Sequence, residues 1–149
     1  MSRKVKRKKT KKPLRPLRER VCIYARTASG EDAELRSLSE QVSHYRGLIK
    51  SQSDRIYAGA YVDAAASGIK EDRENFQHML NACRKGEIDM IITKSISQFS
   101  RNTVTVLSTV RELKSLGIDV YFEKENIHSI SENREIMRSI FASLAQEEI

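Results

Sequence analysis

Apolar residues along the chain recur with two periods in turn, and this alternation predicts strands and helices following one another from about residue 20. Short runs of β-forming residues predict the strands, and apolar residues spaced by three and four predict the helices. The predicted strands cover residues 21–24, 56–62, 89–93 and 119–123. The predicted helices cover residues 35–49, 76–83 and 104–116, and a last one begins near residue 133 and is still running at Ile149.

This order of elements predicts the fold class. Strands that alternate with helices are typical of an α/β three-layer sandwich, in which helices flank a mostly parallel central sheet on both faces. We expect four to five strands in that sheet. The run at residues 89–93 is apolar throughout its centre, as strands covered on both faces are. Such sheets bind ligands beyond the carboxyl ends of their strands, so the loops after strands are the places to look for function.

Charge divides the chain into two unequal parts. Residues 1–20 hold eleven Lys and Arg against one acid, a net charge of +10, whereas residues 21–149 hold sixteen basic and nineteen acidic residues. We predict that residues 1–20 form a disordered basic arm and that residues 21–149 form one domain. The expected partner of the arm is a phosphate backbone, because each contact releases a condensed counterion. A solubilising arm or a targeting signal is the alternative.

Composition argues against several classes of protein. No apolar run approaches the ~20 residues of a membrane span, and no apolar stretch follows the N-terminal charge as in a signal peptide. Cys22 and Cys83 lack metal-ligand spacing, and His44, His78 and His128 lie far apart. The glycine-rich loops that bind nucleotides are also missing from the sequence. We therefore expect no metal and no cofactor, no membrane partner, and a reducing, cytoplasmic location.

The loops after the first three predicted strands share one feature, an arginine among small polar residues. Arg26 follows the first strand, Arg73 lies beyond the second, and Arg101 follows the third. Because the carboxyl ends of parallel strands meet at one edge of a sheet, we expect the three guanidinium groups to converge there. Guanidinium forks suit phosphate, so the pattern predicts an anion site. Each arginine taken singly is equally typical of a solvated surface.

A set of short motifs with co-linear spacing resembles the serine recombinase (resolvase and invertase) family over about residues 20–149. The similarity is greatest to the large serine recombinases of mobile elements. The motifs are Tyr24-x-Arg26 followed by small residues, Ser37-Leu38-x-x-Gln41, Asp63-x-x-x-Ser67-Gly68, Arg73, Ile88-Asp89, Lys94-Ser95-Ile96-Ser97, Arg101-Asn102 and Ser143-Leu144-Ala145-Gln146. The resemblance implies a resolvase-like catalytic domain whose C-terminal helix is used to form dimers.

The resemblance also implies a chemistry, which is phosphoryl transfer without metal or cofactor. A serine attacks a DNA phosphodiester to give a 5′-phosphoserine link and a free 3′-hydroxyl, and the strands reseal after subunits of a tetramer rotate. Arginines neutralise the charge of the transition state. By motif position, the phosphate-binding groups would be Arg26, Arg73 and Arg101, the active-site loop residues Asp63, Ser67 and Gly68, and the supporting polar group Gln41.

Two positions depart from the family pattern. The pattern Tyr-x-Arg-Val-Ser puts the nucleophile at position 28, where this chain has Ala28, and Ser29 is the one nearby candidate. The pattern Ser-Arg-x-x-Arg expects an arginine where this chain has Gln98. Losing one preorganised transition-state donor costs on the order of 10²–10³ in rate. We therefore predict a recombinase domain that is impaired in strand cleavage.

Three hypotheses for the function follow. The chain is an enzyme that acts through Ser29 or an active partner subunit, or it is a non-catalytic DNA-binding or assembly partner of an active recombinase paralogue. A basic ribosome- or RNA-associated protein is the third, and it rests on the arm alone. Under the first two, we expect double-stranded DNA as partner, a homodimer or tetramer through the C-terminal helix, and the bacterial cytoplasm or nucleoid. We also expect the family's C-terminal DNA-binding region to be absent from these 149 residues.

Overall fold

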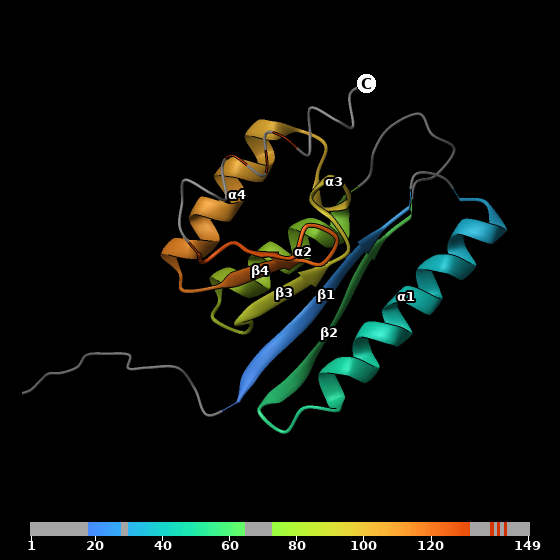
Figure 1. The fold of residues 1–149 in the computed structure, drawn as a ribbon, viewed down its shortest axis with the longest axis horizontal. Coiled ribbons are helices and arrows are strands. Elements are labelled where there is room, and N and C mark those ends of the chain that lie inside the picture. The colour runs from blue at the N-terminus through green and yellow to red at the C-terminus, as the bar shows by residue number, and fades with distance from the viewer. Residues whose placement is uncertain are drawn as a thin grey trace, which may run out of the picture.

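A computed structural model describes residues 18–27, 30–64 and 73–131, together with the single residues 138, 140 and 142. Strands and helices alternate through most of this part of the chain (Figure 1). The strands are β1 (Glu19–Arg26), β2 (Arg55–Asp63), β3 (Met90–Thr93), β4 (Asp119–Phe122) and β5 (Ile127–His128). The helices are α1 (Asp32–Lys50), α2 (Glu74–Arg84), α3 (Ile96–Phe99) and α4 (Thr103–Ser115).

The five strands form one sheet in the order β2-β1-β3-β4-β5. The pairs β1–β2, β1–β3 and β3–β4 are parallel, and β5 runs antiparallel to β4. The expected α/β fold with a mostly parallel sheet of four to five strands is therefore confirmed. The strand order reverses between β1 and β3. From β1 the chain continues to β2 at one edge of the sheet, and from β3 it continues to β4, towards the other edge.

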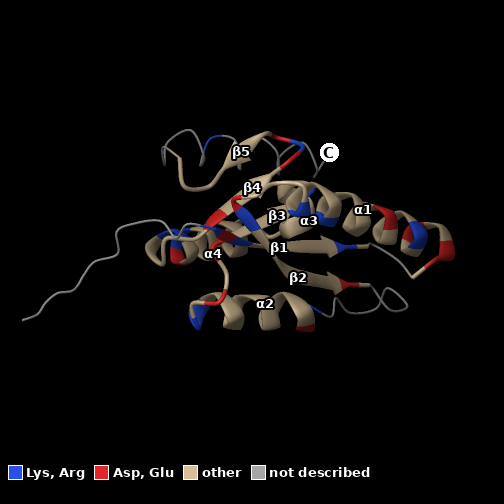
Figure 2. Cartoon of the chain, turned by 90° about the horizontal axis from the view of Figure 1, so that it is seen from below, with Lys and Arg blue, Asp and Glu red and all other residues tan. Residues whose placement is uncertain are grey.

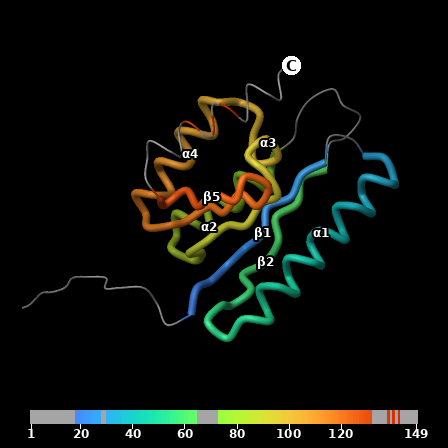
Figure 3. Tube along the Cα trace, in the orientation of Figure 1, coloured from blue at the N-terminus to red at the C-terminus, as the bar shows by residue number. Residues whose placement is uncertain are grey.

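Helices cover both faces of the sheet, which gives three layers. Val21 and Ile23 of β1 contact Tyr45 and Ile49 of α1 on one face. The alternate residue Tyr24 belongs to a larger cluster with side chains of α2 and α4 on the other face. Figure 2 shows α1 and α2 on opposite sides of β1 and β2, and Figure 3 shows α1 running back alongside these strands.

Glycine ends two of the helices. Gly86 follows α2 with φ 79°, and Gly117 follows α4 with φ 78°, a conformation that L side chains rarely adopt. The backbone N–H of Gly86 donates to the carbonyl of Cys83, and that of Gly117 donates to the carbonyl of Lys114, both at 3.0 Å. Each turn then leads the chain into the next strand.

The structure adds two elements that the sequence patterns do not predict. Helix α3 has four residues and β5 has two, too few for a periodic pattern to show. The predicted C-terminal helix falls mostly outside the described residues; residues 138, 140 and 142 are helical, and Ile140 is fully buried in the larger core cluster. Most of the predicted arm, residues 1–17, also lies outside them.

The cysteines and histidines behave largely as packing and surface residues. Cys22 and Cys83 are both buried in the larger core cluster. His44 and His78 are exposed, whereas His128 stacks on Tyr121 and its Nδ1 lies 2.6 Å from Asp119 Oδ2. Among the described helices, none is both long and apolar enough to cross a membrane.

Candidate functional site

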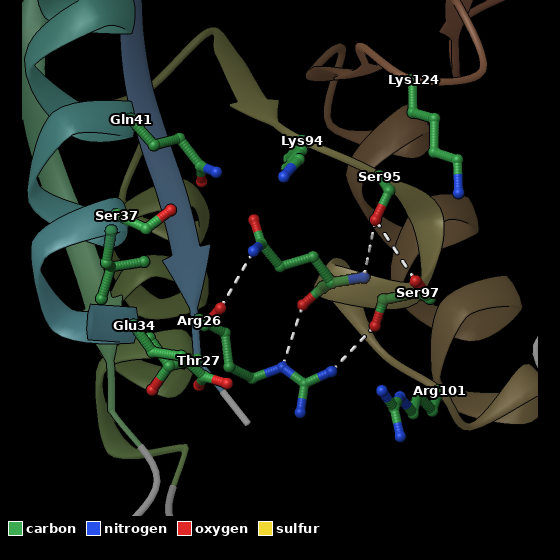
Figure 4. A pocket seen from close by; sticks show the side chains of 12 residues that line it. Arg26, Thr27, Glu34, Ser37, Gln41, Lys94, Ser95, Ser97, Arg101 and Lys124 are labelled. Carbon is green, nitrogen blue, oxygen red and sulfur yellow. Dashed lines mark hydrogen bonds between the residues drawn. The ribbon is translucent and has the colours of Figure 1, made fainter. Parts of the chain in front are cut away.

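A cavity of about 350 Å³ opens at the carboxyl edge of the sheet, between the end of β1, the first half of α1 and the loops after β3 and β4 (Figure 4). This is the point where the strand order reverses, the usual ligand crevice of open α/β sheets. The lining residues are Arg26, Thr27, Glu34, Ser37, Leu38, Gln41, Lys94, Ser95, Ser97, Gln98, Arg101 and Lys124.

Arg26, the last residue of β1, is held against the short helix α3. Its Nε donates to the carbonyl of Gln98 at 3.1 Å and its Nη2 to the carbonyl of Ser97 at 2.8 Å. In return, the side-chain amide of Gln98 donates to the carbonyl of Arg26 at 2.9 Å. The last carbonyls of a helix have no partner within it, so Arg26 caps α3 while it lines the cavity.

Arg73 caps the same helix end from the other side. Its Nη2 donates to the carbonyl of Phe99, and its guanidinium carbon lies 3.7 Å from the centre of the Phe76 ring. The Nε and Nη2 atoms also lie 3.4 and 3.3 Å from the hydroxyl oxygen of Tyr24. Two of the three predicted phosphate-binding arginines thus meet at α3, although Arg73 is not among the residues that line the cavity.

Asp63 joins this group from the end of β2. The hydroxyl of Tyr24 donates to its Oδ2 at 2.8 Å, and burial raises the pKa of Tyr24, which keeps the phenol protonated as a donor. Asp63 also accepts from the backbone N–H groups of Asn75 at 2.9 Å and Phe76 at 3.0 Å, in the first turn of α2. The buried carboxylate therefore fixes both the start of α2 and the Tyr24 hydroxyl.

Three further cations line the cavity. Lys94, Arg101 and Lys124 are exposed, and their side chains make no hydrogen bond or ion pair with any other described residue. Lys94 and Lys124 are brought together because the backbone N–H of Lys124 donates to the carbonyl of Lys94 at 2.8 Å, just beyond the β3–β4 pairing. With Arg26, the lining holds four cations against one acid, Glu34.

Two amide oxygens in the cavity wall have no donor. The Oε1 atoms of Gln41 and Gln98 are buried and accept no hydrogen bond from the described residues. A buried acceptor left unsatisfied costs about 1–3 kcal/mol.

The structure brings together part of the predicted site. Arg26, Arg101, Gln41 and Gln98 share the cavity, whereas Arg73 and Asp63 lie behind it in the Tyr24 network. Ala28, Ser29, Ser67 and Gly68 lie outside the described residues, so the nucleophile positions stay a prediction. The place of Lys94 and Lys124 in the cavity wall was not predicted, although Lys94 directly follows β3 and Lys124 comes two residues after the end of β4, positions that could have indicated it.

Comparisons with known proteins agree with this fold. The family model described as "Resolvase, N terminal domain" matches residues 21–149, and the chain belongs to that family. The resemblance to serine recombinases seen in the sequence motifs is therefore confirmed. No curated protein matches the chain significantly.

Solved structures show the same fold. A resolvase family site-specific recombinase from Streptococcus pneumoniae is 25% identical, with a TM-score of 0.68 and 88% of each chain covered. The N-terminal catalytic domain of TP901-1 integrase is 20% identical, with a TM-score of 0.63 over 87% of this chain and 97% of its own. The C-terminal catalytic domain of ISC1926 TnpA, an IS607-like serine recombinase, is 15% identical, with a TM-score of 0.59 over 70% of each chain.

Proposed function

We propose that this recombinase domain binds the phosphate backbone of duplex DNA in the cavity and is impaired in cutting it. One observation carries the proposal. Three cations without partners among the described residues, Lys94, Arg101 and Lys124, line the same cavity as Gln98, the neutral residue that stands where the motif resemblance leads us to expect an arginine. The cavity thus keeps the cations that can bind a phosphate, whereas a residue expected to stabilise the transition state of cleavage carries no positive charge.

Cleavage makes demands that binding does not. In the family reaction, a serine oxygen bonds to phosphorus while the bond to the 3′-oxygen breaks, and that oxygen leaves as a hydroxyl after taking a proton. The methyl group of Ala28 cannot form such a bond. The Gln98 amide already donates to the Arg26 carbonyl, and it brings no positive charge to the transition state. Both departures lower the rate of cleavage.

Phosphate binding needs only accessible positive charge. Each phosphodiester carries one negative charge, and a lysine ammonium group or an arginine fork can neutralise it without any nucleophile. Arg101 and the lysine pair after β3 and β4 supply such groups. The domain can therefore hold a DNA strand that it does not cut, which suits a partner that assembles with an active recombinase.

The cleavage half of the proposal is tested with a nicked suicide duplex, which traps a covalent protein–DNA adduct. We expect no adduct with the natural chain and a new adduct with the double variant A28S/Q98R, resolved on a denaturing gel. Ser29→Ala is the control for the neighbouring hydroxyl. An adduct with the natural chain that disappears in Ser29→Ala would overturn the proposal and assign cleavage to Ser29.

The binding half is tested by the dependence of DNA affinity on salt. Each phosphate contact contributes about 0.9 to the slope of log affinity against log salt. The variant K94Q/K124Q should therefore lower the slope by about 1.8. Lys85→Gln is the matched control, since Lys85 is exposed and follows α2 at the other edge of the sheet. A slope equal to that of the control would exclude the cavity as a phosphate site.

A further inference from the structure

The turn between β4 and β5 is fixed to the end of β3 by its backbone. The N–H of Glu123 donates to the Thr93 carbonyl at 3.0 Å, and the bond from Lys124 to Lys94 continues this pairing. Asn126 closes the turn with φ 55°, and its N–H donates to the carbonyl of Glu123 at 3.0 Å. These backbone bonds hold the turn at the carboxyl edge of the sheet.

Three successive side chains of this turn serve different parts of the cavity. The Glu123 carboxylate accepts from the hydroxyl of Tyr45 on α1. The Lys124 side chain lines the cavity (Figure 4). Oε1 of Glu125 accepts from the backbone N–H of Ile96, the first residue of α3, at 3.2 Å. The turn thus connects α1 and α3, which lie on opposite sides of the cavity in Figure 4.

Helix α3 depends on such contacts because it is only one turn long. Its four residues cannot form the series of bonds that stabilises a longer helix, and its first N–H groups have no partner within it. Ser95 Oγ accepts from the N–H of Gln98 at 3.1 Å, and Glu125 accepts from that of Ile96. A carboxylate also suits the positive end of the helix dipole. These two side chains fix the start of α3, as two arginines fix its end.

The orientation of α3 decides where the side chain of residue 98 lies. Gln98 is the third residue of α3 and lines the cavity, whereas Glu125 is not among the described residues that line it. Glu125 therefore acts on a bound phosphate through α3 and not by contact. We infer that Glu125 is a positioning residue, which holds α3 so that residue 98 faces the phosphate bound in the cavity. This inference rests on the proposed function, from which it takes the phosphate site.

The first experiment measures the hold of Glu125 on α3 without any DNA. Amide hydrogen exchange, followed by NMR, reports the opening of each N–H group. Glu125→Ala should speed exchange of the Ile96 and Gln98 amides by about tenfold, because a bond to a charged acceptor is lost. Glu125→Gln keeps an oxygen acceptor and should stay within about threefold of the natural chain. Amides of β1 should be unchanged in both variants, which shows that the fold is intact.

The second experiment uses an arginine at position 98 as a probe of its placement. Gln98→Arg should raise the salt slope of duplex DNA affinity by about 0.9, the value of one added phosphate contact. Glu125→Ala should abolish this gain and Glu125→Gln should keep it, because only the second variant holds α3. Glu123→Ala is the matched control, since it removes the same charge from the same turn but breaks a contact with α1. The gain should persist in that background.

The outcomes separate this inference from the proposed function. Unchanged exchange in Glu125→Ala, or a Gln98→Arg gain that persists in Glu125→Ala, would overturn the inference. A gain that is also lost in Glu123→Ala would overturn it too, because general charge would then explain both losses. Faster exchange in Glu125→Ala with no gain in any background would instead overturn the phosphate site, while supporting the hold of Glu125 on α3. If Glu125→Ala does not fold, Glu125→Asp takes its place in both experiments, because its shorter side chain keeps the charge but draws the carboxylate away from α3.

Discussion

Arg26 and Gln98 hold each other through their backbones: each side chain donates to the main-chain carbonyl of the other residue, at 3.1 and 2.9 Å. This reciprocal contact joins the end of β1 to α3, although the two residues are far apart in the sequence. Arg26 therefore stabilises the position of α3 as well as lining the cavity. Arg101 lines the same cavity and has no such contact in the described part of the chain.

The two arginines should therefore respond differently to substitution. Arg26→Met leaves the carbonyls of Ser97 and Gln98 without their donor, and we expect it to lower the free energy of unfolding by about 2 kcal/mol. Arg101→Met should change stability by less than about 0.5 kcal/mol. Both should weaken DNA binding. Urea denaturation and a DNA titration on each variant check this, and equal stability of the two variants would contradict the role of Arg26 at α3.

We expect Asp63 to contribute to the stability of the fold, independently of any role in catalysis. Asp63→Ala removes the acceptor of the Tyr24 hydroxyl and of two backbone N–H groups at the start of α2. We expect a loss of about 3 kcal/mol, because three donors, two of them buried, lose their acceptor. Glu40→Gln, an exposed carboxylate in the middle of α1, is the control and should stay within about 0.5 kcal/mol. A destabilisation no larger than that of the control would leave Asp63 without this role.

The fold could be predicted from the sequence because its main elements are long enough to show a period. The helix α1 spans 19 residues and buries Leu38, Tyr45 and Ile49 on one face, so its pattern is clear. The four-residue α3 depends instead on tertiary contacts and on Ser95, whose side chain accepts from the backbone N–H of Gln98. No periodicity can reveal an element of one turn.

The candidate site was predicted only in part, for a related reason. The rule that loops after parallel strands converge placed Arg26 and Arg101 correctly at one edge. It could not show that Arg73 turns inward, because that depends on the Phe76 ring and the Phe99 carbonyl, which come from other parts of the chain. Side-chain direction is decided by packing partners, and these are not adjacent in sequence.

Alkaline pH should destabilise the domain through its buried thiols. Burial raises the pKa of Cys83 from 9.0 to about 12 and also raises that of Cys22. Between pH 9.0 and about 12, the Cys83 thiol loses its proton in the unfolded chain but keeps it in the folded chain. Its contribution to the free energy of unfolding is therefore fully present below about pH 9 and falls as the pH rises above that value. The fall is at most about 1.4 kcal/mol per pH unit for each thiol.

Denaturant midpoints measured from neutral pH to about pH 10 check this expectation. Cys83→Ala should be less stable at neutral pH, because it leaves a small cavity, but its stability should depend less steeply on pH. Both thiols should also react slowly with a thiol reagent until the chain is unfolded. An equally steep decline in Cys83→Ala would show that other groups cause it.

The pairing of α2 with α4 should weaken at acid pH. Arg84 donates to Glu112 through Nε at 2.7 Å and Nη2 at 3.0 Å, and these bonds lower the pKa of the Glu112 carboxyl. A lowered pKa in the folded chain means that this contribution is present above the ordinary glutamate value and is lost as pH falls below it. Both side chains are well exposed, at 43% and 39%, so solvent screens the pair and we expect about 0.5 kcal/mol.

A double-mutant cycle with Arg84→Met and Glu112→Gln isolates this contribution. The coupling free energy should be measurable at neutral pH and low salt, smaller in high salt because exposed charges are screened, and smaller again in acid as the carboxyl becomes protonated. Arg84 also donates to Asn81 at 3.2 Å, so the single variant Arg84→Met should cost more than Glu112→Gln. A coupling energy that is unchanged by both salt and acid would mean that packing between α2 and α4, and not the ion pair, joins these two residues.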